Sequence, residues 1–258
     1  MNGRMSGGTN GGMNLIRPLI VFTGLVALWQ VYVWLSGVPP YLLPGPVQVI
    51  ETWFAHGRLI AGHALVTGAE ILIGLALGTA LGVVSALCLA YFRPARPWLM
   101  PLLVISQAIP VFALAPLLVL WFGYGMASKV AMAVLIIFFP VTASFYDGLR
   151  RTDPGWLDLG RTMNGSRWAI LRHVRLPAAL PAFASGLRVA TAIAPIGAVV
   201  GEWVGSSAGL GYLMLHANGR MQIDLMFAAL LTLALFAVAI YFTVDAVLRR
   251  ALLWQADD

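Results

Sequence analysis

The chain has 258 residues, of which 60% are hydrophobic and only 10% are charged, whereas soluble domains carry about 25% charged residues. With a mean hydropathy of +0.86, this composition excludes a soluble globular domain and indicates that lipid is the main solvent. The net charge is +6, but the basic residues lie beside apolar stretches, which argues against nucleic-acid binding.

The N-terminal residues 1–14 are rich in Gly, Asn and Ser and are expected to be disordered. Residues 15–258 then form a single transmembrane domain. No cleavage site of small residues accompanies the first apolar stretch, so we predict a retained membrane span rather than a signal peptide.

Six apolar stretches are predicted to cross the membrane, because a transmembrane helix needs about 20 mainly apolar residues. They are Leu19–Leu35, Leu65–Tyr91, Trp98–Phe122, Val130–Tyr146, Gly186–Val204 and Met226–Leu248. The expected fold is therefore an all-α membrane protein with six transmembrane helices.

Basic residues fall unequally on the two sides of these spans. With the N-terminus inside, twelve arginines are cytoplasmic: Arg4, Arg17, Arg93, Arg96, Arg150, Arg151, Arg161, Arg167, Arg172, Arg175, Arg249 and Arg250. Only Arg58, Lys129 and Arg220 then lie outside, and Arg188 is at a boundary. Since cytoplasmic loops carry the excess of Arg and Lys, both termini and residues 150–181 are predicted to be cytoplasmic.

The connector at residues 39–64 is expected on the outer face. Its proline-rich beginning, Val38–Pro46, predicts a stiff extended segment. Apolar residues at helical spacing in Val47–Leu59 fit an amphipathic helix at the membrane interface. A plain connector fits the same residues equally well.

Small residues recur every four positions in the second and fifth spans. The two series are Glu70, Gly74, Gly78 and Gly82, and Gly186, Ala190, Ala194, Ala198 and Glu202. Small side chains let helix backbones approach closely, so both series predict packing surfaces.

Several prolines interrupt the third and fourth spans, and a proline within a helix favours a kink and frees a carbonyl. In lipid such helices usually face protein or a cavity. We therefore take Ser106, Gln107 and Pro110 as candidates for lining a translocation pathway. The alternative is a kinked packing helix in which Gln107 bonds to a neighbour.

The longest break between apolar runs is Arg150–Pro181, which contains six arginines and two aspartates. Asp153 and Pro154 are typical of a helix start, and Asn164–Gly165 accepts the left-handed backbone that ends a helix. Ser166 can cap a second short helix, which Pro177 should limit on its other side. This pattern fits either a docking surface or an ordinary solvated loop.

The same segment resembles a cytoplasmic loop of bacterial ABC importer permeases, whose pattern is E-A-A-x3-G-x9-I-x-L-P. Anchored on Leu176–Pro177, Asp158 stands in place of the Glu, Asn164 in place of the Gly and Val174 in place of the Ile. The residues from Arg161 to Pro181, RTMNGSRWAILRHVRLPAALP, are similar to the group that imports nitrate, sulfonates, taurine and thiamine pyrimidine precursors. This resemblance extends over roughly residues 40–250.

The resemblance implies a type I ABC importer permease of the bacterial inner membrane. It further implies a homodimer, two ATPase subunits on the cytoplasmic face and an extracytoplasmic solute-binding protein. The residues expected to couple to the ATPase are Trp156, Asp158, Gly160, Arg161, Asn164, Gly165, Arg167, Trp168, Leu176 and Pro177.

Relatives in this group also carry an acidic residue a few positions before a Gly-Leu-Gly, which matches Glu202 and Gly209–Gly211 here. A carboxylate at this depth is costly unless it meets water, a partner or a backbone donor. Glu202 is therefore a candidate for the pathway or its outer gate. The alternative is a structural cap of the turn at Ser206–Gly211.

The chain is not expected to be an enzyme. Its single lysine, Lys129, stands between Ser128 and Val130 and cannot belong to a P-loop, so ATP must bind to a partner subunit. Gly205–Gly209 satisfies G-x-S-x-G, but a nucleophile elbow needs a strand-to-helix turn. His56 and His63 have no third ligand nearby and are interpreted as interfacial side chains, and neither a metal nor a cofactor is expected.

Residues 194–229 look most like permeases for hydroxymethylpyrimidine-type thiamine precursors, with sulfonate, taurine and nitrate importers as alternatives. A secondary transporter is a further alternative. It would have inverted repeats and buried ionisable pairs near the middle of the membrane, and neither is evident in the sequence.

Overall fold

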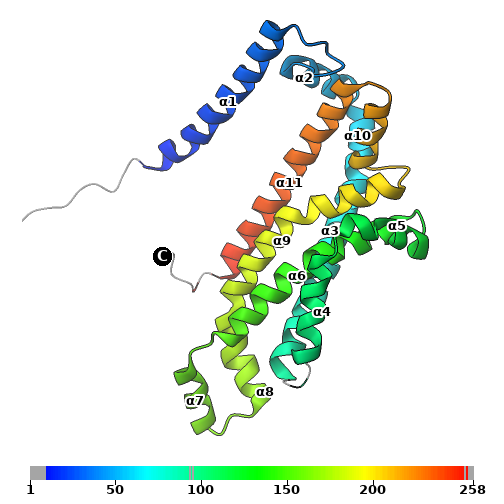
Figure 1. The fold of residues 1–258 in the computed structure, drawn as a ribbon. Coiled ribbons are helices and arrows are strands. Elements are labelled where there is room, and N and C mark those ends of the chain that lie inside the picture. Colours follow the sequence, from blue (N-terminus) through cyan, green and yellow to red (C-terminus); the bar gives the residue numbers. More distant parts are fainter. Residues whose placement is uncertain (1–9, 93, 95, 253, 255–258) are drawn as a thin grey trace, which may run out of the picture.

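The computed structural model describes residues 10–92, 94, 96–252 and 254, and within them every regular element is a helix (Figure 1). The elements are α1 (Asn10–Ser36), α2 (Pro46–Ala55), α3 (Gly57–Tyr91), α4 (Arg96–Ala108), α5 (Val111–Phe122), α6 (Met126–Arg150), α7 (Pro154–Thr162), α8 (Arg167–Ile170), the π-helical turn η2 (Leu171–Arg175), α9 (Leu176–Gly205), α10 (Leu210–Gly219) and α11 (Ile223–Ala251). Helix α1 begins inside the segment 1–14 that was expected to be disordered; residues 1–9 lie outside the described residues.

Helices α3, α6 and α9 form the centre of the molecule, with α6 packed against both of the others. On α3, a Cβ atom added to Gly74, Gly78 or Gly82 would lie only 2.5–2.8 Å from side chains of α6. On α9, a Cβ at Gly186 would lie 2.6 Å from Ser144 Cβ of α6. The small-residue series therefore do form the packing surfaces predicted from their spacing.

Four helical stretches of the described residues are long and apolar enough to cross a membrane, namely Gly57–Tyr91, Met126–Arg150, Arg167–Gly205 and Ile223–Ala251. The third predicted span is not one straight helix, because α4 and α5 are bent by 100° at a short break. Pro110 sits at this break and precedes α5; it lacks an N–H and its ring clashes with a preceding turn, so the helix ends there. In α1, the described apolar part is the shorter stretch Ile20–Ser36.

The two ends of the molecule differ in what they carry. Helices α7 and α8 lie at one end, and α2 and α10 lie at the opposite end (Figure 1). At the second end, Thr52 Oγ1 of α2 donates to Asp224 Oδ2 at 2.9 Å, and Trp53 Nε1 donates to Thr232 Oγ1 at 2.8 Å. The connector thus contains the predicted helix, which ends at Ala55 and packs on α11.

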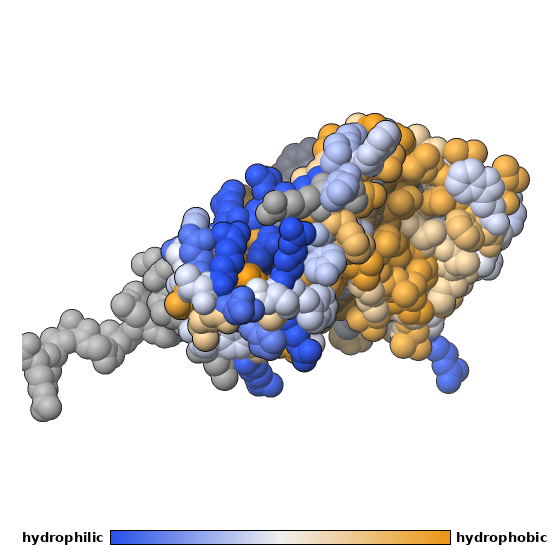
Figure 2. Space-filling view, turned by 90° about the horizontal axis from the view of Figure 1, so that it is seen from below, coloured by the Kyte–Doolittle hydropathy of each residue, from blue (hydrophilic) through white to orange (hydrophobic). Residues whose placement is uncertain are grey.

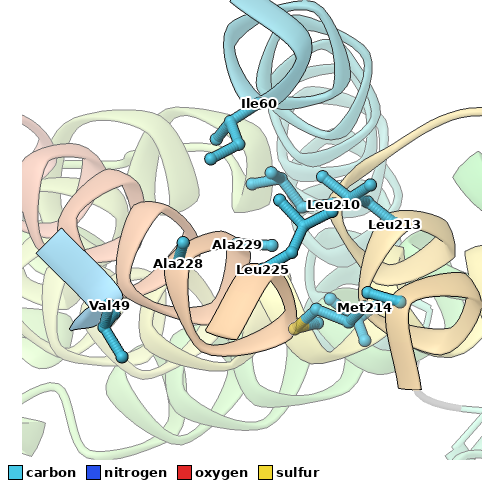
Figure 3. Packing of buried hydrophobic residues seen from close by; sticks show 10 residues of the cluster. Val49, Ile60, Leu210, Leu213, Met214, Leu225, Ala228 and Ala229 are labelled. Atoms are coloured by element: carbon cyan, nitrogen blue, oxygen red, sulfur yellow. The ribbon is translucent and has the colours of Figure 1, made fainter. Parts of the chain in front are cut away.

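A hydrophobic cluster closes this end of the fold (Figure 3). It joins Val49 of α2, Ile60 of α3, Leu210 of α10 and Leu225 of α11, all of which are buried. The cluster holds α10 against the long helices, and it thereby fixes the loop that leads from α9 into α10.

Candidate functional site

Both helices of the segment between α6 and α9 begin with a side-chain cap. Asp153 Oδ1 accepts a hydrogen bond from the Gly155 N–H at 2.7 Å, and Ser166 Oγ accepts one from the Ala169 N–H at 3.1 Å. These are the contacts that satisfy the free donors at a helix N-terminus. The two helix starts predicted from the sequence are therefore confirmed.

Helix α7 ends in a left-handed turn at Asn164, whose φ is 61°. The Asn164 N–H donates to Arg161 O and the Gly165 N–H donates to Gly160 O, both at 2.9 Å. This pair of bonds is the Schellman arrangement, which satisfies the last carbonyls of a helix. A Cβ at Gly165 would lie 2.7 Å from Gly160 O, so only glycine fits and the turn is tight.

The second helix is not the short, separate element that was predicted. Helix α8, η2 and α9 follow one another without a break, and Arg167–Gly205 forms one 39-residue helical stretch. Pro177 does not end it, because the π-helical turn lies directly before the proline and the Leu176 N–H donates to Leu171 O. A proline ring normally clashes with the carbonyl four residues earlier, and the wider π turn relieves that clash.

The turn is therefore joined rigidly to a long central helix, and also to α6. Arg175 Nε and Nη2 both donate to Leu149 O near the end of α6, at 3.0 and 2.7 Å. We call residues 153–177 the corner. Helix α7 leads through the turn at Asn164–Gly165 into this continuous helix.

Large apolar side chains of the corner remain uncovered in the single chain. Trp156, Leu159, Met163 and Trp168 are 56–76% exposed, although hydrophilic side chains gather around this end of the molecule (Figure 2). Asp158 and Arg161 form an exposed ion pair at 2.7 Å on α7. Exposed apolar groups amid polar ones are typical of an interaction surface.

Glu202 lies near the other end of α9 and is only 1% exposed. Its carboxylate accepts hydrogen bonds from Thr67 Oγ1 at 2.6 Å, from the Gly211 N–H, and from the Tyr212 N–H at 3.2 Å. The two backbone donors belong to the first turn of α10, where a carboxylate is favourable. Gly209 has a φ of 112°, and a Cβ there would overlap the Glu202 carboxyl group.

A second buried carboxylate lies one turn away from Thr67 on α3. Glu70 is fully buried and forms an ion pair with Lys129 Nζ of α6 at 3.3 Å; among the described residues its carboxylate has no hydrogen bond. We call Thr67, Glu70, Lys129 and Glu202 the buried charge cluster. One sequence interpretation is corrected here: a buried ionisable pair does exist, although none was evident in the sequence. Lys129, which the count of basic residues assigns to the outer side, is buried within α6.

The comparisons with known proteins now identify the family. A family model described as "Binding-protein-dependent transport system inner membrane component" matches residues 78–252, which include the corner and Glu202. The chain belongs to this family. It is the permease component of an ABC transporter, a multi-pass protein of the inner membrane, and not the catalytic subunit.

Individual relatives agree with the family. The permease is 58% identical to a "Probable ABC transporter permease protein" of Haemophilus influenzae, over 92% of this chain and 97% of the relative. It is 37% identical to "Formylaminopyrimidine transport permease protein ThiX" of Halalkalibacterium halodurans, over 93% and 96%. It is 38% identical to "Riboflavin transport system permease protein RibX" of Chloroflexus aurantiacus, over 90% and 87%.

A solved structure shows the same fold. An inward-facing conformation of the MetNI methionine ABC transporter aligns with a TM-score of 0.66, covering 76% of this chain and 97% of that chain. The sequence identity is 20%, so this likeness establishes the ABC importer permease fold and nothing about the solute.

The four candidates for the pathway lie in two separate places. Ser106 Oγ bonds to Leu103 O within α4 at 2.7 Å, Gln107 is exposed, and Pro110 lies at the α4–α5 bend. Glu202 belongs instead to the buried charge cluster. Its contacts support the alternative of a structural cap, while a role of any of the four in translocation stays a prediction.

Sequence reasoning missed the partners of Glu202. Thr67 both donates to Glu202 and accepts from the Leu210 N–H at 2.7 Å, and His63 Nδ1 accepts from the Gly209 N–H at 3.0 Å. His63 had been interpreted as an interfacial side chain. The available signal was the spacing of His63, Thr67 and Glu70, which places them on one face of a helix.

Proposed function

We propose that this permease imports a small solute containing a pyrimidine ring, with a thiamine pyrimidine precursor as the first choice. The observation that carries this proposal is the near full-length similarity to the formylaminopyrimidine permease ThiX. The riboflavin permease RibX is equally similar, and riboflavin also contains a pyrimidine ring within its fused ring system. Few charged side chains lie within the spans, which favours a neutral solute over an anion.

The proposed assembly is a homodimer of six-span subunits with two ATPase subunits and an extracytoplasmic binding protein. Helix α1 would be the first span, and the bent pair α4–α5 would be the third. The N-terminus, the C-terminus and the corner would then face the cytoplasm, as the distribution of arginines predicts.

Coupling to the ATPase is proposed to occur at the corner. Trp156 and Trp168 would be the apolar anchors, and the charges and turn residues around them would set the docking geometry: Asp158, Gly160, Arg161, Asn164, Gly165, Arg167, Leu176 and Pro177. When the ATPases close on ATP, they would move α7. The continuous helix Arg167–Gly205 would transmit this movement as a rigid-body tilt that switches access between the two sides.

A second candidate solute is an aliphatic sulfonate. It is favoured by 30% identity to "Putative aliphatic sulfonates transport permease protein SsuC" of Bacillus subtilis, over 93% of this chain. Taurine and nitrate belong to the same alternative, since the resemblance of the corner covers importers of all three. A secondary transporter is disfavoured by the family, although the pair of Glu70 and Lys129 is of the kind such proteins use.

The test is uptake into proteoliposomes that contain the permease, its cognate ATPase and its binding protein. Radiolabelled formylaminopyrimidine should accumulate only with ATP inside and with the binding protein outside. Unlabelled riboflavin, taurine and nitrate serve as competitors. Competition by taurine without any uptake of the pyrimidine would move the assignment to the sulfonate group, and uptake driven by an ion gradient without ATP would contradict the ABC mechanism.

A further inference from the structure

A cavity of about 600 Å³ lies beside the corner, between the end of α3, the start of α4, the end of α6 and the segment α7–η2. Among the described residues that line it, five are arginines and none is an aspartate or glutamate. The arginines are Arg96, Arg150, Arg161, Arg167 and Arg175. We call this cavity the arginine pocket.

Arg161 is paired with Asp158, whereas neutral groups contact the guanidinium groups of Arg96 and Arg150. Arg96 Nε donates to Leu89 O at 2.8 Å, and the guanidinium groups of Arg96 and Arg150 lie 5.6 and 5.7 Å from the Tyr146 ring. Among the described residues, no carboxylate lies within 4.0 Å of Arg96, Arg150 or Arg167. Several like charges facing one concave space create a strong positive potential, and an anion in the pocket would neutralise it.

The lining side chains indicate which anion fits. A guanidinium group presents a planar fork of donors that matches the oxygens of a phosphate. Tyr91 also lines the pocket and contacts Trp168 edge to face, with ring centroids 6.2 Å apart. Half-exposed Tyr and Trp rings are typical of the level of lipid headgroups, and basic pockets between transmembrane helices bind anionic headgroups.

We infer that the arginine pocket binds a phosphate group, supplied by an anionic phospholipid of the inner leaflet. The lipid would link the start of α4 and the end of α6 to the corner. It would thereby restrain the helix that the proposed function assigns to the ATPase.

The faces of α7 argue for a lipid and against a carboxylate of the ATPase. Leu157 and Arg161 line the arginine pocket, whereas Trp156, Leu159 and Met163 line a separate apolar groove of about 450 Å³. The exposed aromatic anchor therefore lies on a different face of α7 from the pocket. An ATPase that grips Trp156 on that face would leave Tyr91, Arg96 and Arg150 of the arginine pocket to the lipid, while Arg161, Gly165 and Arg167 are shared by the two proposed contacts.

The test measures phosphatidylglycerol binding to the purified, delipidated permease by native mass spectrometry, with phosphatidylcholine as the reference lipid. The pocket variant is Arg150→Gln with Arg167→Gln. The matched control is Arg151→Gln with Arg172→Gln, which removes the same charge from exposed neighbours that do not line the pocket. Each pocket arginine should contribute about fivefold, so the pocket variant should bind about 25-fold more weakly, and the control should change less than about twofold.

Folding is checked for every variant by thermal unfolding, and Arg150→Gln alone replaces the double variant if that one does not fold. Millimolar inorganic phosphate distinguishes the source of the ligand, because it should not displace the lipid. If phosphate alone stabilises the protein through Arg150 while the lipid does not bind, the ligand is a soluble phosphate and the lipid assignment is wrong. The inference would be overturned if the pocket variant and the control variant lost lipid affinity equally. It would also be overturned if the pocket variant lost ATPase binding but kept its lipid affinity.

Discussion

The corner and the buried charge cluster hold charged residues in opposite ways. In the corner, the capping bonds and the ion pair of Asp158 and Arg161 join residues two to five positions apart, and most of these groups are exposed. In the cluster, Thr67 and Glu202 are 135 positions apart, and all four members are buried. Helix α7 and its turn are therefore held by local bonds, whereas the cluster ties α3, α6, α9 and α10 together.

This difference assigns separate tasks to the two regions. Exposed ion pairs contribute little to stability, so substitutions in the corner should change coupling and leave the fold intact. Removing one partner of a buried pair leaves an uncompensated charge, so substitutions in the cluster should act first on the fold. Three predictions test this division.

The largest effect is expected from Lys129→Met. The substitution leaves Glu70 buried without its cation and should lower the free energy of unfolding by about 3–5 kcal/mol. Unfolding of the purified permease by titration with sodium dodecyl sulfate measures this loss. The control is Glu70→Met together with Lys129→Met, which replaces the pair by apolar groups of similar length and should recover most of the lost stability. If the double variant is as unstable as Lys129→Met, the two residues do not act as a pair.

The next effect is on transport and concerns Asp158→Lys together with Arg161→Glu. The exchange keeps an ion pair on α7 but reverses the charges presented to a docked ATPase, so uptake should fall on the order of 100-fold. The unfolding transition and membrane insertion should stay unchanged. Asp158→Glu together with Arg161→Lys preserves the charges and serves as the control. Normal uptake by the reversed pair would reject the assignment of the corner to coupling.

The ease of predicting each region from the sequence follows the same division. The caps at Asp153 and Ser166 and the turn at Asn164 depend on neighbouring residues, so residue type and order were sufficient to predict them. The ion pair of Glu70 with Lys129 depends on how α3 packs against α6, and no local pattern contains that information. From the sequence, Lys129 therefore contributes only to the count of basic residues on the outer side, and its buried partner is not evident.

The effect of a proline depends on the turn that surrounds it: the kink predicted for the third span is found at Pro110, whereas the helix limit predicted at Pro177 is not. Pro110 ends α4 and produces a bend of 100°, whereas Pro177 is accommodated by a π turn and the helix continues. Both were expected to act on their helices, but the sequence did not distinguish a break from a continuous helix. The outcome at Pro177 matters for the proposed function, because the proposed coupling requires that α8, η2 and α9 form one continuous helix.

The smallest effect is expected at Asn164, where the backbone is left-handed. Asn164→Gly should keep the end of α7 unchanged, whereas Asn164→Ala should weaken it by roughly 1 kcal/mol, because alanine has no side-chain amide to favour this conformation. The loss should be local, and amide hydrogen exchange in α7 should become about fivefold faster, which is the rate equivalent of that free energy. The global unfolding transition should not move, in contrast to Lys129→Met. Equal exchange rates in the two variants would show that the turn is held from elsewhere, and a shift of the global transition would show that the corner is not a separate unit.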